Sequence, residues 1–218
     1  MKNIIITGAT GMTGGIILKQ CLESKEIGKI TSFVRKPSGV EHSKLNEVVI
    51  SDFMDYSKHQ DEFKDIDAVY FCIGVYTGAV SDEKFKEITV DYTNRFVDAL
   101  KEHSPNAKFC FLSGGGADNT EKSRMSFAKY KGMAENYMFA NLVNAITFRP
   151  GYIYPVEKRQ EPNFSYKVSR FLYPLIKLLG RNASIKSTEL AYGMFKAGLR
   201  GAPKNILENR DILNFIEH

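Results

Sequence analysis

The 218-residue sequence has few cysteines, and the three that it has stand far apart at Cys21, Cys72 and Cys110. An odd number of scattered cysteines argues against a disulfide framework and predicts reduced thiols, as in a cytoplasmic protein. Cys72 and Cys110 stand inside apolar runs, which is typical of buried, inert thiols. No spacing of Cys and His matches a zinc site, so we expect no bound metal.

Long hydrophobic runs are missing as well. The most apolar late stretch, residues 171–179, is interrupted by Pro174 and Lys177 and is too short to cross a bilayer. The chain begins without the basic and then apolar segments of a signal peptide. Its net charge of +5 is spread along the sequence and forms no stripe, which argues against nucleic-acid binding. We therefore expect a soluble cytoplasmic protein with no nucleic-acid or membrane partner.

The length and the 43% content of hydrophobic residues fit one globular α/β domain over residues 1–218. Short, continuous apolar runs predict strands at residues 3–7, 30–34, 47–50, 68–73, 108–112 and 145–148. Longer stretches between them predict helices at residues 14–23, 81–102 and 122–141. Runs of this kind are typical of strands buried on both faces of a parallel sheet. The alternation predicts a Rossmann fold, a doubly wound parallel sheet with right-handed crossovers.

The pattern changes after the sixth predicted strand. A loop opens at Arg149, Pro150 and Gly151, and helical stretches follow at residues 164–179 and 188–199. We interpret residues 151–200 as the main part of a small C-terminal substrate lobe over the carboxyl edge of the sheet, and not as a separate domain.

A glycine-rich turn joins the first strand to the first helix. Its candidate cofactor-binding residues are Gly8, Thr10, Gly11, Met12, Thr13 and Gly14. Gly8 permits a tight turn, Gly11 lets the backbone approach a pyrophosphate, and Gly14 lets the helix pack closely on the strand. The helix N-terminus offers free N–H groups and a partial positive charge to the phosphates. The alternative is an ordinary glycine-rich turn without a ligand.

The second strand ends in basic residues, about twenty positions after the glycines. An acidic residue at this place would bind the adenosine ribose hydroxyls and favour NAD(H). Arg35 is suited to pair with a 2′-phosphate and stack on the adenine, with help from Lys36. The sequence therefore favours NADP(H), with NAD(H) as the other possible cofactor. The alternative is a solvated basic strand end.

Two further strand ends supply candidate cofactor contacts. Asp52 ends the third strand, where it would meet the adenine amino group beside Phe53, or would instead cap the next turn. Cys72, Ile73 and Gly74 end the fourth strand, and Gly74 suits a close approach to the cofactor. A plain turn glycine is the alternative for Gly74.

These motifs together resemble the atypical short-chain dehydrogenase/reductase superfamily, near the NmrA-like and Tat-interacting-protein-like proteins. The resemblance covers nearly the whole chain. It is carried by Thr7-Gly8-x-x-Gly11-x-x-Gly14, Cys72-Ile73-Gly74, Val90-Asp91-Tyr92, Phe111-Leu112-Ser113, Lys131-Gly132-Met133-Ala134-Glu135, Arg149-Pro150-Gly151-Tyr152-Ile153-Tyr154 and Ser187-Thr188-Glu189-Leu190-Ala191. It implies an NAD(P)-binding protein that acts on a small-molecule substrate.

The resemblance also implies a catalytic Ser, Tyr and Lys. In that family Ser polarises a carbonyl, Tyr transfers a proton, and Lys lowers the Tyr pKa and holds the nicotinamide ribose. Ser113 and Lys131 match, but Phe127 stands where the Tyr should precede Lys131 by four residues. Tyr130 is the nearest substitute on the same helix. Further possible donors are Tyr152 and Tyr154. Without the resemblance, Ser113 would be a polar strand end and Lys131 an exposed helix lysine.

Two functions follow from these expectations. The first is an NADP(H)-dependent oxidoreductase or epimerase-like enzyme for a small carbonyl or alcohol, with Pro150, Gly151 and Ile153 beside the nicotinamide. The second is a non-catalytic redox sensor or regulatory protein, which the replacement of Tyr by Phe127 favours. A homodimer through the helices at residues 81–102 and 122–141 is a possible assembly.

Overall fold

A seven-stranded parallel sheet forms the centre of the protein. The computed structural model describes residues 1–157, 173 and 180–217. The strands are β1 Lys2–Thr7, β2 Ile27–Val34, β3 Leu45–Val49, β4 Ala68–Phe71, β5 Lys108–Leu112, β6 Ala145–Arg149 and β9 Ile206–Glu208. Their order is β3-β2-β1-β4-β5-β6-β9, and every neighbouring pair is parallel. The winding direction reverses between β1 and β4, and ligands of such sheets bind at this switch point.

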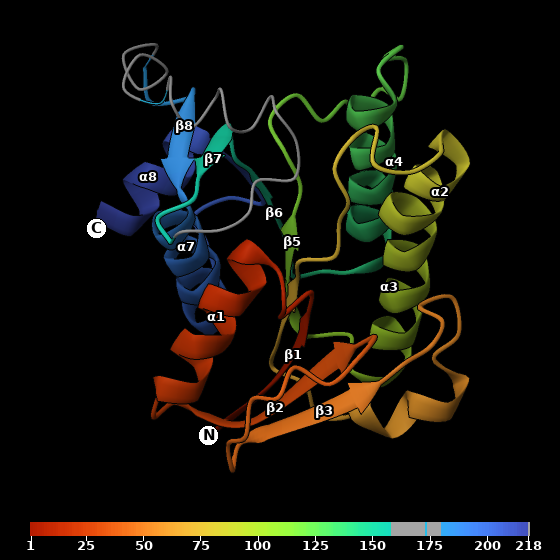
Figure 1. Ribbon diagram of the computed structural model, residues 1–218, viewed down its shortest axis with the longest axis vertical. Helices are drawn as coiled ribbons and strands as arrows, with labels where there is room; N and C mark the ends of the chain where they lie inside the picture. The colour runs from red at the N-terminus through yellow and green to blue at the C-terminus, as the bar shows by residue number, and fades with distance from the viewer. Residues whose placement is uncertain (158–172, 174–179, 218) are drawn as a thin grey trace.

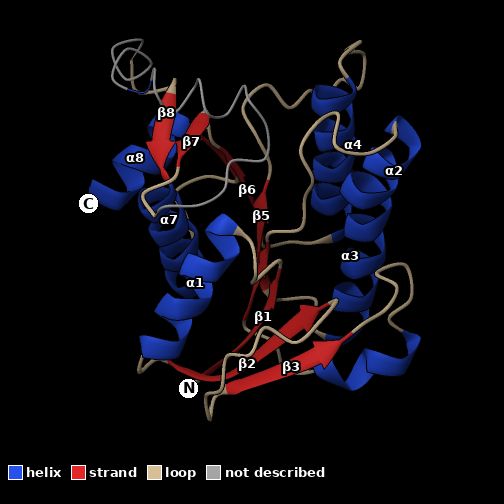
Figure 2. Ribbon diagram, viewed as in Figure 1, coloured by secondary structure: helices blue, strands red, loops and turns tan. Residues whose placement is uncertain are grey.

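Helices cover both faces of the sheet, as Figures 1 and 2 show. They are α1 Met12–Glu23, α2 Asp82–Lys86, α3 Tyr92–His103, α4 Ser126–Asn141, α7 Ser187–Arg200 and α8 Asn209–Glu217. α1, α7 and α8 lie on one face, and α2, α3 and α4 lie on the other. The Rossmann architecture predicted from the sequence is thereby confirmed. Across the described ranges, no helix combines the length and apolar character needed to cross a membrane.

Burial on both faces explains the continuous apolar strands. Side chains alternate between the two faces of a strand, so Ile4 and Ile6 join the core beneath α1 and α7, while Ile5 joins the opposite core. That opposite core is rich in aromatic side chains, with Phe63 and Phe96 packed edge to face at a centroid distance of 5.0 Å. The sheet thus carries a separate hydrophobic core on each side.

Several predicted elements have different limits in the structure, and three of these differences lie near the site. The stretch at residues 81–102 is α2 and α3 joined by a π-helical turn at Glu87–Asp91. The helix expected from residue 122 begins at Ser126, because the preceding backbone at Met125 is extended. β4 ends at Phe71, so Cys72 and Ile73 lie in the loop that follows.

The C-terminal part differs more from the expectation of a substrate lobe. The helix predicted at residues 188–199 is α7, which packs on α1 and buries Leu190 and Met194 against the sheet. A separate two-stranded parallel sheet, β7 Tyr152–Tyr154 with β8 Ser184–Lys186, is the described part of the lobe. The helix predicted at residues 164–179 lies outside the described residues, except for position 173. β9 and α8 were not predicted; three residues, the length of β9, are too few for a measurable periodicity.

Candidate cofactor and active site

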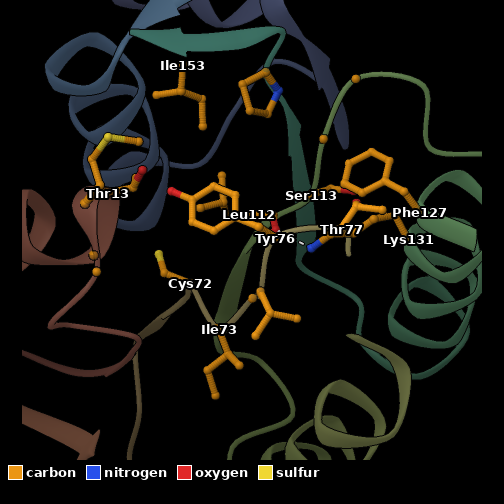
Figure 3. A pocket seen from close by; sticks show the side chains of 18 of the residues that line it. Thr13, Cys72, Ile73, Tyr76, Thr77, Leu112, Ser113, Phe127, Lys131 and Ile153 are labelled. Atoms are coloured by element: carbon orange, nitrogen blue, oxygen red, sulfur yellow. Dashed lines mark hydrogen bonds between the residues drawn. The ribbon is translucent and has the colours of Figure 1, made fainter. Parts of the chain in front are cut away.

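A cavity of about 480 Å³ opens where the carboxyl ends of β1, β4, β5 and β6 meet. Its described lining comes from residues 11–14, 72–77, 112–115 and 150–153, with Phe127, Lys131 and Pro155. Figure 3 shows Thr13 on one side, Ser113, Phe127 and Lys131 on the opposite side, and Cys72 between them. Parallel strands direct their carboxyl ends to one edge, which is why motifs far apart in sequence converge here.

The glycine turn has the local geometry expected for a diphosphate site. Gly8 has a φ of +69°, a conformation that side-chain-bearing residues rarely adopt. A Cβ on Gly14 would lie 2.2 Å from the Gly8 carbonyl oxygen, so only glycine fits there. α1 starts at Met12 without a side-chain cap or an acidic residue in its first turn. Its first amides are therefore free of a competing carboxylate, and the residues fit an anionic cofactor.

The residues predicted to contact the adenosine part of the cofactor have different environments in the structure. Arg35 and Lys36 are exposed just beyond β2 and do not line the described cavity. The Asp52 carboxylate accepts a hydrogen bond from the Met54 backbone N–H at 2.8 Å, so it caps its own turn. Phe53 is buried, with its ring stacked on Tyr92 at a centroid distance of 5.6 Å. Arg35 and Lys36 are thus accessible to a ligand, whereas the Phe53 side chain belongs to the core.

Ser113 stands one residue beyond β5, and its side chain lines the cavity. The residue is 8% exposed, and its hydroxyl oxygen makes no hydrogen bond of standard geometry among the described residues. It does lie close enough to the Glu135 carboxylate to help lower the pKa of that group. A buried polar atom without a partner costs about 1–3 kcal/mol and therefore needs an explanation. A ligand oxygen in the cavity would supply the missing partner.

Lys131 projects from α4 into the same part of the cavity and is 7% exposed. Its Nζ donates a hydrogen bond to the Leu112 carbonyl oxygen at 3.0 Å and lies 4.8 Å from the centroid of the Phe111 ring. Burial lowers the pKa of the Lys131 ammonium to about 8, although Glu135 and Cys72 act in the opposite direction. Lys131 is therefore not the exposed helix lysine of the alternative interpretation.

A buried ion pair supports this part of the site. Glu135, one turn after Lys131, is fully buried and pairs with Arg149 at the end of β6. It also accepts hydrogen bonds from Asn119 Nδ2 and Thr147 Oγ1, each at 3.0 Å. Burial raises the pKa of the Glu135 carboxyl, but hydrogen bonds, above all those from Arg149, leave it below its usual range. The pair joins α4 to β6, directly before Pro150 and Gly151.

The aromatic candidates on α4 point in different directions. Phe127 lines the cavity, with its ring against Gly114. Tyr130 does not line it, because its hydroxyl donates a hydrogen bond to Asp82 Oδ2 of α2 at 2.5 Å. The structure therefore does not bring Tyr130 to Ser113, and the expectation of a substitute phenol at this position is not met. Tyr152 does line the cavity, whereas Tyr154 does not. The Tyr154 ring stacks on the Tyr173 ring at a centroid distance of 3.9 Å.

Several lining residues were not predicted as site residues. They are Val75, Tyr76, Thr77, Leu112, Gly114, Gly115 and Pro155. Residues 75–77 belong to a loop after β4 that has no periodicity, so no local pattern marks them. The group Gly114–Gly116 is visible in the sequence, but only the fold shows that Gly114 and Gly115 line the cavity. Within the described ranges, no group of three His, Cys, Asp or Glu residues could hold a metal ion.

The fold and this crevice together define a dinucleotide-binding protein of the Rossmann type. Residues 8–163 match the family described as NAD(P)H-binding, and the chain belongs to that family. Rat protein HTATIP2 is 26% identical over 155 residues, which cover 70% of this chain and 63% of the relative. Protein FMP52, mitochondrial, of Lodderomyces elongisporus is 30% identical over 144 residues, 62% and 59% of the two chains. The matches thus span less than two thirds of either relative.

Solved structures agree with this assignment of the fold. The enzyme WbmH of Bordetella bronchiseptica, in complex with NAD+, has a TM-score of 0.70 at 18% identity, over 95% of this chain and 74% of its own. Gre2 of Candida albicans, in complex with NADPH, has a TM-score of 0.69 at 16% identity, over 95% and 78%. The relationship to NmrA-like atypical short-chain dehydrogenases/reductases, expected from the motifs, is confirmed.

Proposed function

We propose that this chain is an NADP(H)-dependent oxidoreductase for a small carbonyl or alcohol substrate. One observation carries the proposal: a single cavity joins the glycine turn to the buried Ser113 hydroxyl and the buried Lys131 amine. Polar groups that are buried without full partners, at the switch point of a parallel sheet, are typical of a site that completes its hydrogen bonds with ligand.

Each part of the cavity has a role in this proposal. Backbone amides at Met12, Thr13 and Gly14 bind the diphosphate. Arg35 with Lys36, outside the described cavity lining, binds the 2′-phosphate. Lys131 holds the nicotinamide ribose, while Pro150, Gly151 and Ile153 lie against the nicotinamide. When bound, the cofactor supplies or accepts the hydride that the reaction needs. The apolar walls at Ile153 and Phe127 exclude water from the reacting atoms.

The lining also favours a weakly polar substrate. Among the described lining residues, Lys131 alone carries a formal charge. One similar structure is a UDP-N-acetylglucosamine 4-epimerase in complex with UDP-N-acetylmuramic acid. A nucleotide-sugar diphosphate requires several cationic or amide donors beyond those of the cofactor. The described cavity supports an uncharged carbonyl compound better, and therefore an oxidoreductase better than an epimerase.

A second candidate function is a non-catalytic NADP(H) sensor. The observation in its favour is that no phenol of α4 reaches the cavity, because Phe127 has no hydroxyl and Tyr130 bonds to Asp82. The two functions share a cofactor site and differ in turnover. NADPH consumption with a panel of uncharged aldehydes and ketones distinguishes them, and tight binding without turnover would favour the sensor.

Cofactor choice is tested by titrating the protein with NADPH and NADH and following cofactor fluorescence. We expect Arg35→Ala to weaken NADPH binding by about tenfold or more and to leave NADH binding unchanged. A charged hydrogen bond is worth about 1.5–3 kcal/mol, and about 1.4 kcal/mol corresponds to tenfold. Lys29→Ala, an exposed lysine on the same strand paired with Glu62, is the control. An unchanged preference in Arg35→Ala would contradict the NADP(H) assignment.

Compartment and assembly are also proposals. Free cysteines at positions 21, 72 and 110 support the reducing cytoplasm, whereas one relative is named as mitochondrial. A homodimer through α3 and α4, which pack together on one face of the sheet, follows from the sequence expectation. Light scattering on the purified protein measures the assembly directly.

A further inference from the structure

The site has no hydroxyl where its resemblance to dehydrogenases implies one. A Cβ built on Gly114 would lie 2.4 Å from Cζ of Phe127, the ring carbon that carries the hydroxyl in tyrosine. The tip of the ring therefore packs closely on the backbone after β5. Phe127 forms an apolar part of the cavity wall and has no hydroxyl group. The proton that a carbonyl reduction requires must therefore come from another group.

Two groups beside this wall offer hydrogen to a ligand. The Ser113 hydroxyl makes no hydrogen bond of standard geometry among the described residues, and the Glu135 carboxylate is the acceptor nearby. Lys131 Nζ makes one hydrogen bond, to the carbonyl oxygen of Leu112, the residue before Ser113. An ammonium has three N–H donors, so two remain for a ligand. Figure 3 shows Ser113, Phe127 and Lys131 gathered on the same side of the cavity.

The surroundings of Lys131 suit proton transfer. Glu135 on the same helix is held by Arg149 of β6 and makes no hydrogen bond with the Lys131 ammonium. Cys72, after β4, is a neutral thiol because burial raises its pKa to about 12. On the side of β5 the ammonium meets the Phe111 ring and the Leu112 carbonyl oxygen. With burial lowering its pKa to about 8, Lys131 releases a proton near neutral pH, as an efficient general acid must.

We propose that Lys131 is itself the proton donor of this enzyme, acting directly on a carbonyl oxygen that the Ser113 hydroxyl holds by a hydrogen bond. This inference rests on the proposed oxidoreductase function and deepens it. As the carbonyl carbon gains a hydride from NADPH, the oxygen takes a proton from Lys131 Nζ. The products are an alcohol, NADP+ and a neutral lysine amine, which water reprotonates. In the reverse direction the neutral amine accepts the alcohol proton.

The first test is the pH dependence of NADPH oxidation with 4-nitrobenzaldehyde as the probe. We expect kcat of the wild-type protein to fall above pH 8, as the ammonium loses its proton. Lys131→Arg keeps a cation that cannot release its proton. We expect it to lower kcat by about 100-fold or more, the usual contribution of general acid catalysis, and to change the NADPH Kd by less than about fivefold. Lys129→Arg, on the same helix but outside the cavity lining, is the control.

A second measurement does not depend on turnover. Trace acetic anhydride labelling of the cofactor-free protein, followed by peptide mass spectrometry, reports the titration of each lysine. We expect Lys131 to titrate near pH 8, well below the ordinary lysine value of about 10.4. A Lys131 midpoint near the ordinary value would overturn the assignment of the proton donor.

The outcomes separate the two proposals. A wild-type protein that does not turn over any carbonyl probe overturns both the oxidoreductase and the proton donor. A wild-type protein that reduces the probe with a flat profile between pH 7 and pH 10, and in which Lys131→Arg keeps its kcat, overturns the proton donor alone. A loss in Lys131→Arg that appears only in the NADPH Kd has the same meaning, because Lys131 would then only hold the ribose.

Discussion

At the scale of single residues, Lys131 is at once the proposed proton donor and one of the least favourable side chains for stability. The residue is 7% exposed and its ammonium has no carboxylate of its own, because Glu135 is engaged by Arg149. A buried charge without a full partner destabilises the folded state. Sites of this kind are expected where activity requires a perturbed group and the rest of the fold supplies the stability.

Replacing this lysine should therefore stabilise the protein. We expect Lys131→Met to raise the free energy of unfolding at pH 7 by about 1–3 kcal/mol, since a similar volume is buried without a charge. Urea denaturation measures the change, and Lys129→Met serves as the control on the same helix. A lower free energy of unfolding in Lys131→Met would mean that the ammonium has favourable partners that outweigh its burial.

The effect of Lys131→Met on the free energy of unfolding should depend on pH. Lys131 has a folded-state pKa of about 8, below the unfolded value of about 10.4. Between these values the unfolded chain binds the additional proton, so this lysine contributes a rise in stability with increasing pH. We expect the stability difference between Lys131→Met and wild type to shrink from pH 8 to pH 10. A constant difference over that window would contradict the lowered pKa.

At the scale of elements, α4 supplies several of the side chains of the candidate site. It supplies Phe127 and Lys131 to the cavity and Glu135 to the ion pair with β6. The helix can do this because it packs very closely on the loop after β5, where the Asp118 N–H donates to the Ala128 carbonyl oxygen at 2.9 Å. The position of Phe127 and Lys131 in the cavity depends on this contact between backbones.

Gly132 is the residue that permits this contact. A Cβ at this position would lie 1.8 Å from the Asp118 carbonyl oxygen, and the backbone cannot move away as a side chain can. We expect Gly132→Ala to lower the free energy of unfolding by about 1–3 kcal/mol, as overpacking does. We also expect it to reduce NADPH turnover, because Lys131 is displaced.

A second helical glycine gives the matched control. In Gly193→Ala the new Cβ would meet a side-chain methyl of Ile212 at 3.0 Å, and alanine favours the helix by about 1 kcal/mol over glycine. We expect its stability to stay within about 1 kcal/mol of wild type and its turnover to be unchanged. Equal losses in both variants, measured by urea denaturation, would show that the α4 contact has no special role.

At the scale of the whole molecule, the crevice and the sheet form one cooperative unit. The glycine turn follows β1, the loop with Cys72 follows β4, and Lys131 is placed through β5 and β6. A ligand that binds across these strand ends contacts segments from position 11 to position 153. Binding should therefore stabilise the complete fold and not one local segment.

This stabilisation is measurable as a thermal shift. At a concentration of 100 times its Kd, NADPH should raise the free energy of unfolding by about 2.7 kcal/mol, equal to about 5–10 °C in Tm for a chain of this size. NADH at the same concentration should give about half the shift if it binds tenfold more weakly. Equal shifts would contradict the preference for NADP(H), and no shift with either would contradict the cofactor site.

The sequence by itself determined the parts that depend on local pattern. The parallel sheet follows from continuous apolar strands, since both faces are buried, and the site around β1 and α1 follows from glycines that no other residue could replace. Ser113 and Lys131 were found through a motif whose order along the chain reflects the same fold. The short β7, β8 and β9 escaped prediction because three residues have no period.

Only the tertiary structure decided which side chains meet. The Tyr130 hydroxyl donates a hydrogen bond to Asp82, and the Phe127 ring packs against Gly114. The Asp52 carboxylate accepts a hydrogen bond from within its own turn. The fold also buries Glu135 with Arg149, and it leaves the Ser113 hydroxyl without a hydrogen bond of standard geometry in the described part of the protein. These features depend on contacts between segments distant in sequence, and on the space and charge that packing leaves at each position. No periodicity or motif spacing encodes these contacts, so the sequence alone could not predict which side chains interact at the site.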